Sequence, residues 1–529
     1  MMTQQLELRV ALLDRQIGSL VSAVRVLTLV VASLVAAVIC REIYGQDAAS
    51  KPKQVATPRE ATGWALGDVV TLRADDRPFA RYVWIPPWGT PEWPAAVNFA
   101  VNTAASHATT IQLATPVANG WLLRYDLRRL APQPKQLARL IETWDGLAVD
   151  DPYFHVPQAN SKIQAAILAP HLEQPEAVAL TGLSSSGGGI YRADWLLVKM
   201  LSTLEGGRYY DFLQVDRGTP KTGTQQTEWL AGLGVFERQT QQLSGDQRAG
   251  LFRSAVTGKP RRLDVFYGLG RGGNLVSITH DVSDDDVQAE KHPIRNLLSI
   301  EQVAHEIIVE RPNGMHAFAL TNGKGEFVDS APDNVASDST IPAPHTRRLQ
   351  PAISCIRCHG PHDGWQPFAN DVQTILRSGL DVFTDLADQQ NTREQIIDRL
   401  AGLYAGDLDA ADGPLGRARR NYLAATFRIA GGPRIGEEKP LSPVAHVSAL
   451  CGSIYQQHRY DLVTPARAAL ELGYDSATLD DALGPVDTTS SVDPIVGSLR
   501  AGLSVNRSDW ETVFADAALA AETRREASK

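Results

Sequence analysis

The chain has 529 residues, a formal net charge of −9, 43% hydrophobic residues and 21% charged residues. This length is enough for about two to four domains with substantial cores, and the composition excludes wholesale disorder. The chain has no basic run and no aromatic-interleaved Lys/Arg patch, so nucleic acid is not expected as a partner; four cysteines exclude a disulfide framework.

The first 41 residues are predicted to be an export segment that lies outside the fold. Residues 26–40 form an uncharged, mostly apolar run. The arginines that precede this run favour a cytoplasmic N-terminus: Arg9, Arg15 and Arg25. The alternatives are a cleaved signal segment and a buried or amphipathic helix, and we favour a retained transmembrane anchor. The protein is then expected at the cytoplasmic membrane, with the bulk of the chain facing the periplasm.

A linker at 42–58 is expected to lead into an α+β domain at 59–333. Short β-like runs predict strands at 69–72, 81–85, 110–113, 121–126 and 262–267. Helical periods predict helices at 94–106, 134–143, 192–204 and 225–233. Residues 307–320 are the clearest hairpin, because Asn313-Gly314 tolerates the positive φ angles of a tight turn, and a second turn is expected at 322–325.

Four other patterns in this domain are read as structural. Gly268-x-Gly270-x-x-Gly273 matches the dinucleotide fingerprint, but residues 274–279 after it predict a strand, so we expect a hairpin turn. The run 184–189 lacks the lysine of a phosphate-binding loop. The aspartates at 284–286 lack the spacing of a calcium loop, so calcium is not expected as a ligand. The aromatic and proline-rich loop at 86–93 is expected to pack, with binding of a sugar or a partner as the alternative.

The motif Cys355-Ile356-Arg357-Cys358-His359 is typical of c-type haem attachment. Two thiols one helical turn apart can add to the two vinyl groups of a haem, and the adjacent imidazole can reach the iron. The alternatives are half of a zinc site, for which His362 is the only further ligand nearby, and a redox pair of cysteines. We therefore predict one covalent haem c on Cys355 and Cys358, with His359 as iron ligand.

The sixth ligand of the iron is not identified by the sequence. No Met follows Met315, so the usual downstream Met is excluded, and His362 lies too close to His359 to reach the opposite face of the ring. The remaining candidates for the sixth ligand are His316, His446, His458 and Met315, and the position can also be open. Arg348 and Arg357 suit haem propionates or a plain surface role, and Cys451 is expected in the core.

The chain after the motif is predicted to be helical. Apolar spacing predicts helices at 371–387, 392–404, 415–428, 443–457 and 464–472. A linker is expected at 478–494, followed by a helix at 508–525 that Ser508 and Glu511 would open as a capping box. The predicted organisation is therefore an anchor, the α+β domain, a mostly helical cytochrome c-like haem domain at 334–475, and a linker with a C-terminal helix at 476–529.

Several segments together resemble a family of exported bacterial proteins with one c-type haem, most of them without an established reaction. The resemblance is carried by residues 350–359, 305–308, 312–314, 191–195 and 507–511. It implies haem-binding roles only for Cys355, Cys358 and His359.

Three function classes follow from a single haem c. The first is an electron carrier at the outer side of the membrane, which needs a redox partner protein. The second is a haem enzyme of peroxidase-like type or a gas or redox sensor with an open axial position. The third is a binding module in which the haem is structural. We expect the carrier.

Overall fold

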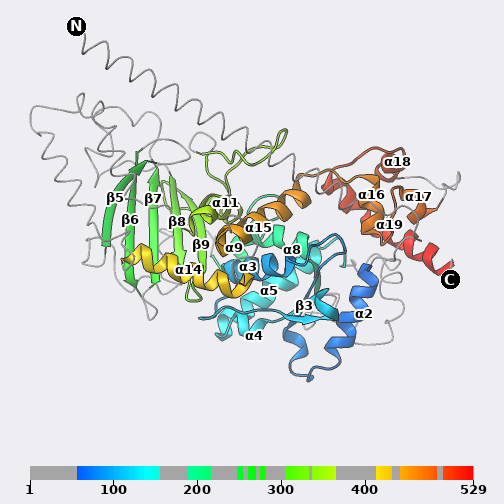
Figure 1. The fold of residues 1–529 in the computed structure, drawn as a ribbon, viewed down its shortest axis with the longest axis horizontal. Helices are drawn as coiled ribbons and strands as arrows, with labels where there is room; N and C mark the ends of the chain where they lie inside the picture. The colour runs from blue at the N-terminus through cyan, green and yellow to red at the C-terminus, as the bar shows by residue number, and fades with distance from the viewer. Residues whose placement is uncertain are drawn as a thin grey trace, which may run out of the picture. The chain divides into compact units, whose positions relative to one another are not determined.

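The computed structural model describes ten segments of the chain, and all of them belong to the compact unit 55–529 (Figure 1). The described residues are 56–154, 189–215, 247–253, 260–269, 274–281, 304–332, 336–364, 413–431, 441–484 and 493–527. They form a mixed α+β structure, as predicted. Among the helices of these segments, none has the length and apolar character needed to span a bilayer, and the predicted anchor lies outside them.

A four-stranded sheet forms the first part of the core. Its strand order is β2 (Thr115–Val117), β3 (Leu122–Asp126), β1 (Ala80–Trp84) and β4 (Ile190–Arg192). β1 pairs antiparallel with β3 and parallel with β4. All five residues of β1 are buried, which is the pattern of a strand that is covered on both faces.

A five-stranded antiparallel sheet follows, and each strand pairs with the next one along the chain. The strands are β5 (Gln247–Arg253), β6 (Pro260–Leu269), β7 (Asn274–Asp281), β8 (Ala304–Glu310) and β9 (His316–Asn322). Helix α14 (Pro414–Ala430) crosses this sheet in Figure 1, and its Asn421 amide donates to Glu310 Oε1 at 2.7 Å. β7 pairs with β6 and follows the glycine-rich run that ends at Gly273. This confirms the strand that was expected after the predicted hairpin turn.

The predicted Asn-Gly hairpin is confirmed as β8 and β9, and its tip packs against an irregular helix end. Helix α3 (Trp93–Ala100) continues as a π-helical turn at Val101–Ala105. Arg311 at the hairpin tip is buried, and its Nη1 donates to the Thr103 carbonyl at 2.7 Å. Burial lowers the pKa of this guanidinium to about 10. Arg311 thus satisfies carbonyl groups that a helix end leaves without partners.

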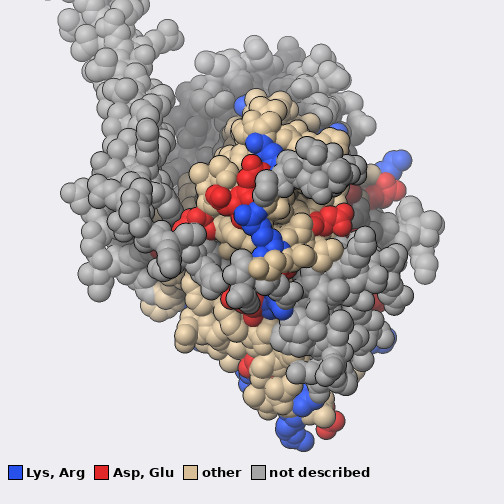
Figure 2. Space-filling model, turned by 90° about the vertical axis from the view of Figure 1, so that its right-hand side faces the viewer, with Lys and Arg blue, Asp and Glu red and all other residues tan. Residues whose placement is uncertain are grey.

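Five of the remaining helices were predicted, those that begin at Pro134, Ala193, Pro443, Pro465 and Arg507. The remaining helices are α2 (Pro58–Val69), α4 (Leu127–Leu130), α5 (Pro134–Asp150), α8 (Ala193–Leu201), α9 (Tyr209–Phe212), α11 (Ile353–His359), α15 (Pro443–Arg459), α16 (Pro465–Glu471), α17 (Leu479–Leu483), α18 (Pro494–Arg500) and α19 (Arg507–Ala527). Side-chain caps define several starts: Thr57 and Glu60 form a capping box on α2, Ser442 caps α15 and Thr464 caps α16. On the face drawn in Figure 2, the described basic and acidic side chains are interspersed.

Two predicted strands are wrong. Residues 69–72 end helix α2 and form the turn after it. Residues 110–113 are not a strand because the side chain of Asn102 binds both backbone groups of Gln112: its Oδ1 accepts from the Gln112 amide at 2.9 Å and its Nδ2 donates to the Gln112 carbonyl at 2.7 Å. Strand β2 begins only at Thr115.

Two predictions near the C-terminus are also wrong. The linker expected at 478–494 contains the short helix α17 and the start of α18. Helix α19 begins at Arg507, so Ser508 lies inside its first turn. Glu511 does not act as a capping-box partner, because its carboxylate accepts from the Tyr153 hydroxyl at 2.8 Å and faces His458.

One hydrophobic core extends across the predicted boundary between 333 and 334. Buried residues of α3, β8, α11, α14 and α15 all belong to it. The division into an α+β domain and a haem domain stays a prediction, and the packing adds that both parts share this core. The predicted helices at 225–233, 371–387 and 392–404 and the aspartates at 284–286 lie outside the described residues.

The hairpin tip provides a test of this packing. Gly314 has φ +83°, and a Cβ added there lies 3.0 Å from the Asn421 carbonyl oxygen. We expect Gly314→Ala to lower the free energy of unfolding by more than about 1 kcal/mol, because an L-residue is strained at this φ and the contact must widen. Chemical denaturation monitored by circular dichroism measures the change.

The matched control is Gly146→Ala in helix α5. A Cβ there meets nothing within 4 Å. This substitution should raise stability by up to about 1 kcal/mol, since alanine loses less chain entropy than glycine. Equal effects of the two substitutions would contradict the packing of the hairpin tip on α14.

Candidate functional site

Helix α11 carries the three residues of the attachment motif on one face. The loop before it, 347–352, is confirmed as non-helical, and Ala352 at its end has φ 62°. Positions i, i+3 and i+4 of an α-helix are neighbours on its surface. The thiols of Cys355 and Cys358 and the imidazole of His359 therefore share one side of α11.

The imidazole of His359 is held by one of its two nitrogens. Its Nδ1 lies 2.9 Å from the Gly364 carbonyl oxygen, so the hydrogen-bond network assigns the proton to Nδ1. The Nε2 atom lies 3.4 Å from Oε1 of Glu306 on β8, a contact that is an ion pair when Nε2 carries a proton and that leaves Nε2 as the basic nitrogen when it does not. The ring of Phe318 packs beside the imidazole at 5.9 Å between centroids. An imidazole fixed through Nδ1 with a basic Nε2 is the usual state of a metal-binding histidine.

The turn that supplies this carbonyl requires glycine. Gly364 has φ +96°, and a Cβ added there lies 2.7 Å from both His316 Cε1 and Tyr422 Cδ1. The rings of His316 and Tyr422 are themselves stacked, at 4.0 Å and an interplanar angle of 14°. The backbone at 364 is therefore wedged between His359 and this ring pair.

The two thiols have different surroundings. Cys355 is 2% exposed, whereas Cys358 is exposed. Burial, followed by the charge of Glu306 and a hydrogen bond to it, raises the pKa of the Cys355 thiol well above its usual value. Burial next to Glu306 thus favours the neutral form of the Cys355 thiol.

The opposite side of α11 faces a groove. The groove has a volume of about 520 Å³ and lies between Arg357, Thr340 and residues of α15 such as Gly452. The Arg357 Nη1 donates to Thr340 Oγ1 at 2.6 Å and pairs with Asp338 at 3.3 Å. Arg357 is therefore bound to its own chain on the side of α11 away from Cys355 and His359.

The structure separates the candidates for a second iron ligand. His316 is fully buried on the Nδ1 side of His359, next to Gly364. Met315 is fully buried in the hairpin turn directly before β9.

The two candidates on α15 also lie elsewhere. Val444 and Ser448 of this helix contact Gly360, and His446 lies two positions from each, about 200° around the helix. His458 lies ten positions beyond Ser448, about 15 Å farther along the helix axis. Glu306 faces Nε2 of His359, and no pattern in the sequence identifies it.

The zinc alternative receives no support from the described residues. Among them, no group of three or more His, Cys, Asp or Glu side chains is arranged to hold a metal ion. A haem needs fewer protein ligands because the porphyrin supplies four nitrogens. The thiol pair, the imidazole fixed through Nδ1 and its basic Nε2 fit the donor set of a covalent haem.

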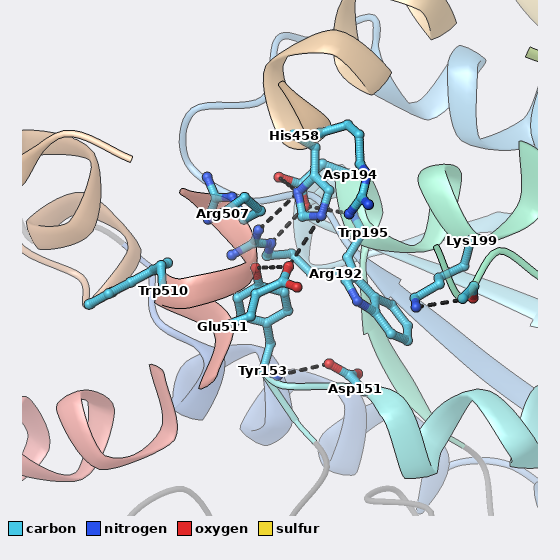
Figure 3. Close-up of polar contacts among 12 residues, drawn as sticks. Asp151, Tyr153, Arg192, Asp194, Trp195, Lys199, His458, Arg507, Trp510 and Glu511 are labelled. Carbon is cyan, nitrogen blue, oxygen red and sulfur yellow. Dashed lines mark hydrogen bonds and ion pairs between the residues drawn. The ribbon is translucent and has the colours of Figure 1, made fainter. Parts of the chain in front are cut away.

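A second cluster of polar residues is buried elsewhere in the core (Figure 3). Arg192 at the end of β4 is 1% exposed and pairs with Asp194 at 2.7 Å and with Glu471 of α16 at 2.9 Å. Its guanidinium carbon lies 3.4 Å from the ring centroid of Tyr153. The cluster thereby connects β4 and α8 with the C-terminal helices.

Glu471 is the acceptor shared by most of this cluster. Besides Arg192, it accepts from Arg507 at 2.7 Å, from Arg467 at 2.8 Å and from Trp510 Nε1 at 3.0 Å. Burial opposes ionisation of Glu471, but the three guanidinium groups outweigh it and hold the pKa of this carboxyl below its usual value.

His458 closes the cluster on the side of α15. Its Nε2 lies 3.3 Å from Glu511 and its Nδ1 lies 3.5 Å from Asp194. Nearby, burial raises the pKa of Asp151 to about 7. Two of the segments on which the family resemblance rests, 191–195 and 507–511, therefore meet here. Arg192 and Arg507 share the acceptor Glu471, and Asp194 and Glu511 both face His458.

Comparison of the chain with protein-family models, with curated protein sequences and with solved structures finds no match in any of the three.

The ion cluster predicts a large effect of one isosteric substitution. Glu471→Gln should lower the free energy of unfolding by about 3–5 kcal/mol, because it leaves buried guanidinium groups without their carboxylate. The control is Asp480→Asn in the half-exposed pair with Arg500, which should change stability by at most about 1 kcal/mol. Similar effects of the two substitutions would contradict this reading.

The same substitution should change the pH dependence. The folded-state pKa of Glu471 is lowered, so its contribution is complete above the unfolded-state pKa of about 4.3 and is lost as the pH falls below it. Between about pH 5 and pH 2, wild-type stability should therefore fall more steeply than that of Glu471→Gln. Denaturation curves at several pH values measure the two slopes.

Proposed function

We propose that this protein binds one haem c covalently through Cys355 and Cys358, with His359 as an iron ligand, and transfers single electrons to a redox partner protein. The observation that carries the proposal is the state of His359. Its Nδ1 is bound to the Gly364 carbonyl, and its basic Nε2 lies on the same side of α11 as both thiols. When bound, the haem supplies one-electron redox chemistry, and the described residues fix where it is attached and how the imidazole is oriented.

A second candidate is a haem enzyme or sensor with an exchangeable axial position. It is favoured by the side chain that faces Nε2 of His359, which is a carboxylate. The residue that does face it is Glu306, at 3.4 Å. The third class, a binding module with structural haem, has no specific observation in its favour.

Attachment is tested by haem staining after denaturing electrophoresis of protein made with a periplasmic maturation system. Wild type should keep its haem, Cys358→Ser should lose most of the stain, and His359→Ala should mature poorly because the iron loses a ligand. Cys451→Ala is the matched control, because Cys451 is buried against the Ala96 carbonyl and should leave the stain unchanged. Haem that extracts from wild type into acidified solvent would overturn the proposal.

Location is the second test of the proposed function, which places the chain at the cytoplasmic membrane with its bulk in the periplasm. The full chain should fractionate with membranes and resist extraction by high salt. Deletion of residues 1–41 should leave haem-free protein in the cytoplasm, since covalent haem attachment in bacteria takes place outside it. A cleavable secretory signal in place of 1–41 should restore haem in a soluble form. Holoprotein made by the deletion variant would contradict the export argument.

A further inference from the structure

Helix α14 carries charges of one sign only. Its 17 residues include four arginines and no Asp, Glu or Lys. Helices α5 and α19, which are at least as long, carry charges of both signs. The chain as a whole has a net charge of −9, so the overall composition does not account for a purely basic helix.

The two faces of α14 have different roles. The inner face packs into the core through buried residues such as Leu415, Tyr422 and Ile429. The helix lies across the five-stranded sheet (Figure 1), and its outer face is exposed. Exposed residues three, four and seven positions apart lie on one side of a helix, so they form a stripe about 16 Å long. This basic stripe consists of Arg417, Arg420, Ala424, Phe427 and Arg428.

Two of the four arginines have carboxylates of the chain beside them. Arg417, at one end of the basic stripe, lies near Glu310 of β8. Arg419, on the flank of the helix, lies 3.6 Å from Asp363. These contacts join α14 to the sheet and to the turn after α11, so they account for these two charges by the fold itself.

The other two arginines have no such role. Arg420 and Arg428 form no ion pair with any residue that the structure describes. Phe427, which lies between them in the sequence, is 48% exposed. Arginine and aromatic side chains are enriched in protein interfaces, whereas lysine is depleted there. The composition of the basic stripe is thus that of a contact surface.

We propose that the basic stripe of α14 docks an acidic surface of a partner protein. Two unpaired guanidinium groups beside an exposed ring are complementary to carboxylates that surround an apolar spot, and opposite charges speed the encounter of two proteins. A lipid surface is a poorer occupant, because an interfacial helix buries its broad apolar face in the bilayer and α14 packs that face into the core.

The docked partner would lie beside the candidate site. Tyr422 on the inner face of α14 stacks on His316, and both rings contact Gly364, whose carbonyl oxygen holds His359. The outer face is one helix diameter away, about 10 Å. The inference goes beyond the proposed function and does not require the haem.

The test is binding of a fluorescein-labelled oligoglutamate to the full chain, measured by fluorescence anisotropy. Wild type should bind at low salt despite its net negative charge. Binding should weaken as the ionic strength rises from about 0.01 M to about 0.15 M, because the Debye length falls from about 30 Å to about 8 Å. The double variant Arg420→Glu/Arg428→Glu should bind about tenfold more weakly or not at all, and the neutral variant Arg420→Gln/Arg428→Gln should lie between.

The matched control is Arg73→Glu/Arg129→Glu, which makes the same charge change at two exposed arginines outside α14 and should keep wild-type binding. Circular dichroism should show the same unfolding for all variants, since the substitutions are on the surface. Absence of binding at low salt, or equal loss in both glutamate variants, would overturn the inference. Self-association of wild type that Arg420→Glu/Arg428→Glu abolishes in sedimentation velocity would assign the stripe to a second copy of this chain and contradict the proposal. The haem stain is a separate readout, so failure here leaves the proposed function untouched.

Discussion

The hydrogen bond between His359 Nδ1 and the Gly364 carbonyl is the constraint on which the site depends. It is possible only because the chain reverses within five residues of α11, with Gly364 in a conformation that L-residues avoid. The reversed backbone is wedged against the stacked rings of His316 and Tyr422, which come from β9 and α14. The orientation of one imidazole is thus set by the sheet, by a helix that crosses it and by the turn after α11.

The buried ion cluster applies the same principle to the other end of the core. Three arginines and three carboxylates, of which Glu471 is the common acceptor, lose their hydration together, so each depends on the others for charge compensation. An arrangement of this kind contributes less to net stability than to specificity: removal of one member leaves several charges uncompensated. It therefore fixes how α16 and α19 dock on β4 and α8, and only a narrow set of substitutions is compatible with it.

The sequence predicted those features that depend on neighbouring residues. The hairpin at 307–320 follows from Asn313-Gly314, and α15 and α16 follow from apolar spacing. Predictions from the sequence failed where contacts between distant residues determine the structure. The Asn102 side chain binds the backbone groups of Gln112 within 110–113, and Arg192 pairs with Glu471, 279 positions away. The attachment motif was visible because its residues are contiguous. Glu306 was not, since only the pairing of β8 and the packing of α11 bring it to His359.

The position of Glu306 also bears on which kind of haem protein is proposed. Electron carriers keep two strong-field ligands so that the iron changes little in geometry between oxidation states, whereas enzymes and sensors keep one position weak or open. Glu306, the residue beside Nε2 of His359, would not supply a second strong-field ligand. The sheet holds this carboxylate in place, since β8 is paired on both sides. Of the proposed functions, the haem enzyme or sensor is therefore the one that this contact favours.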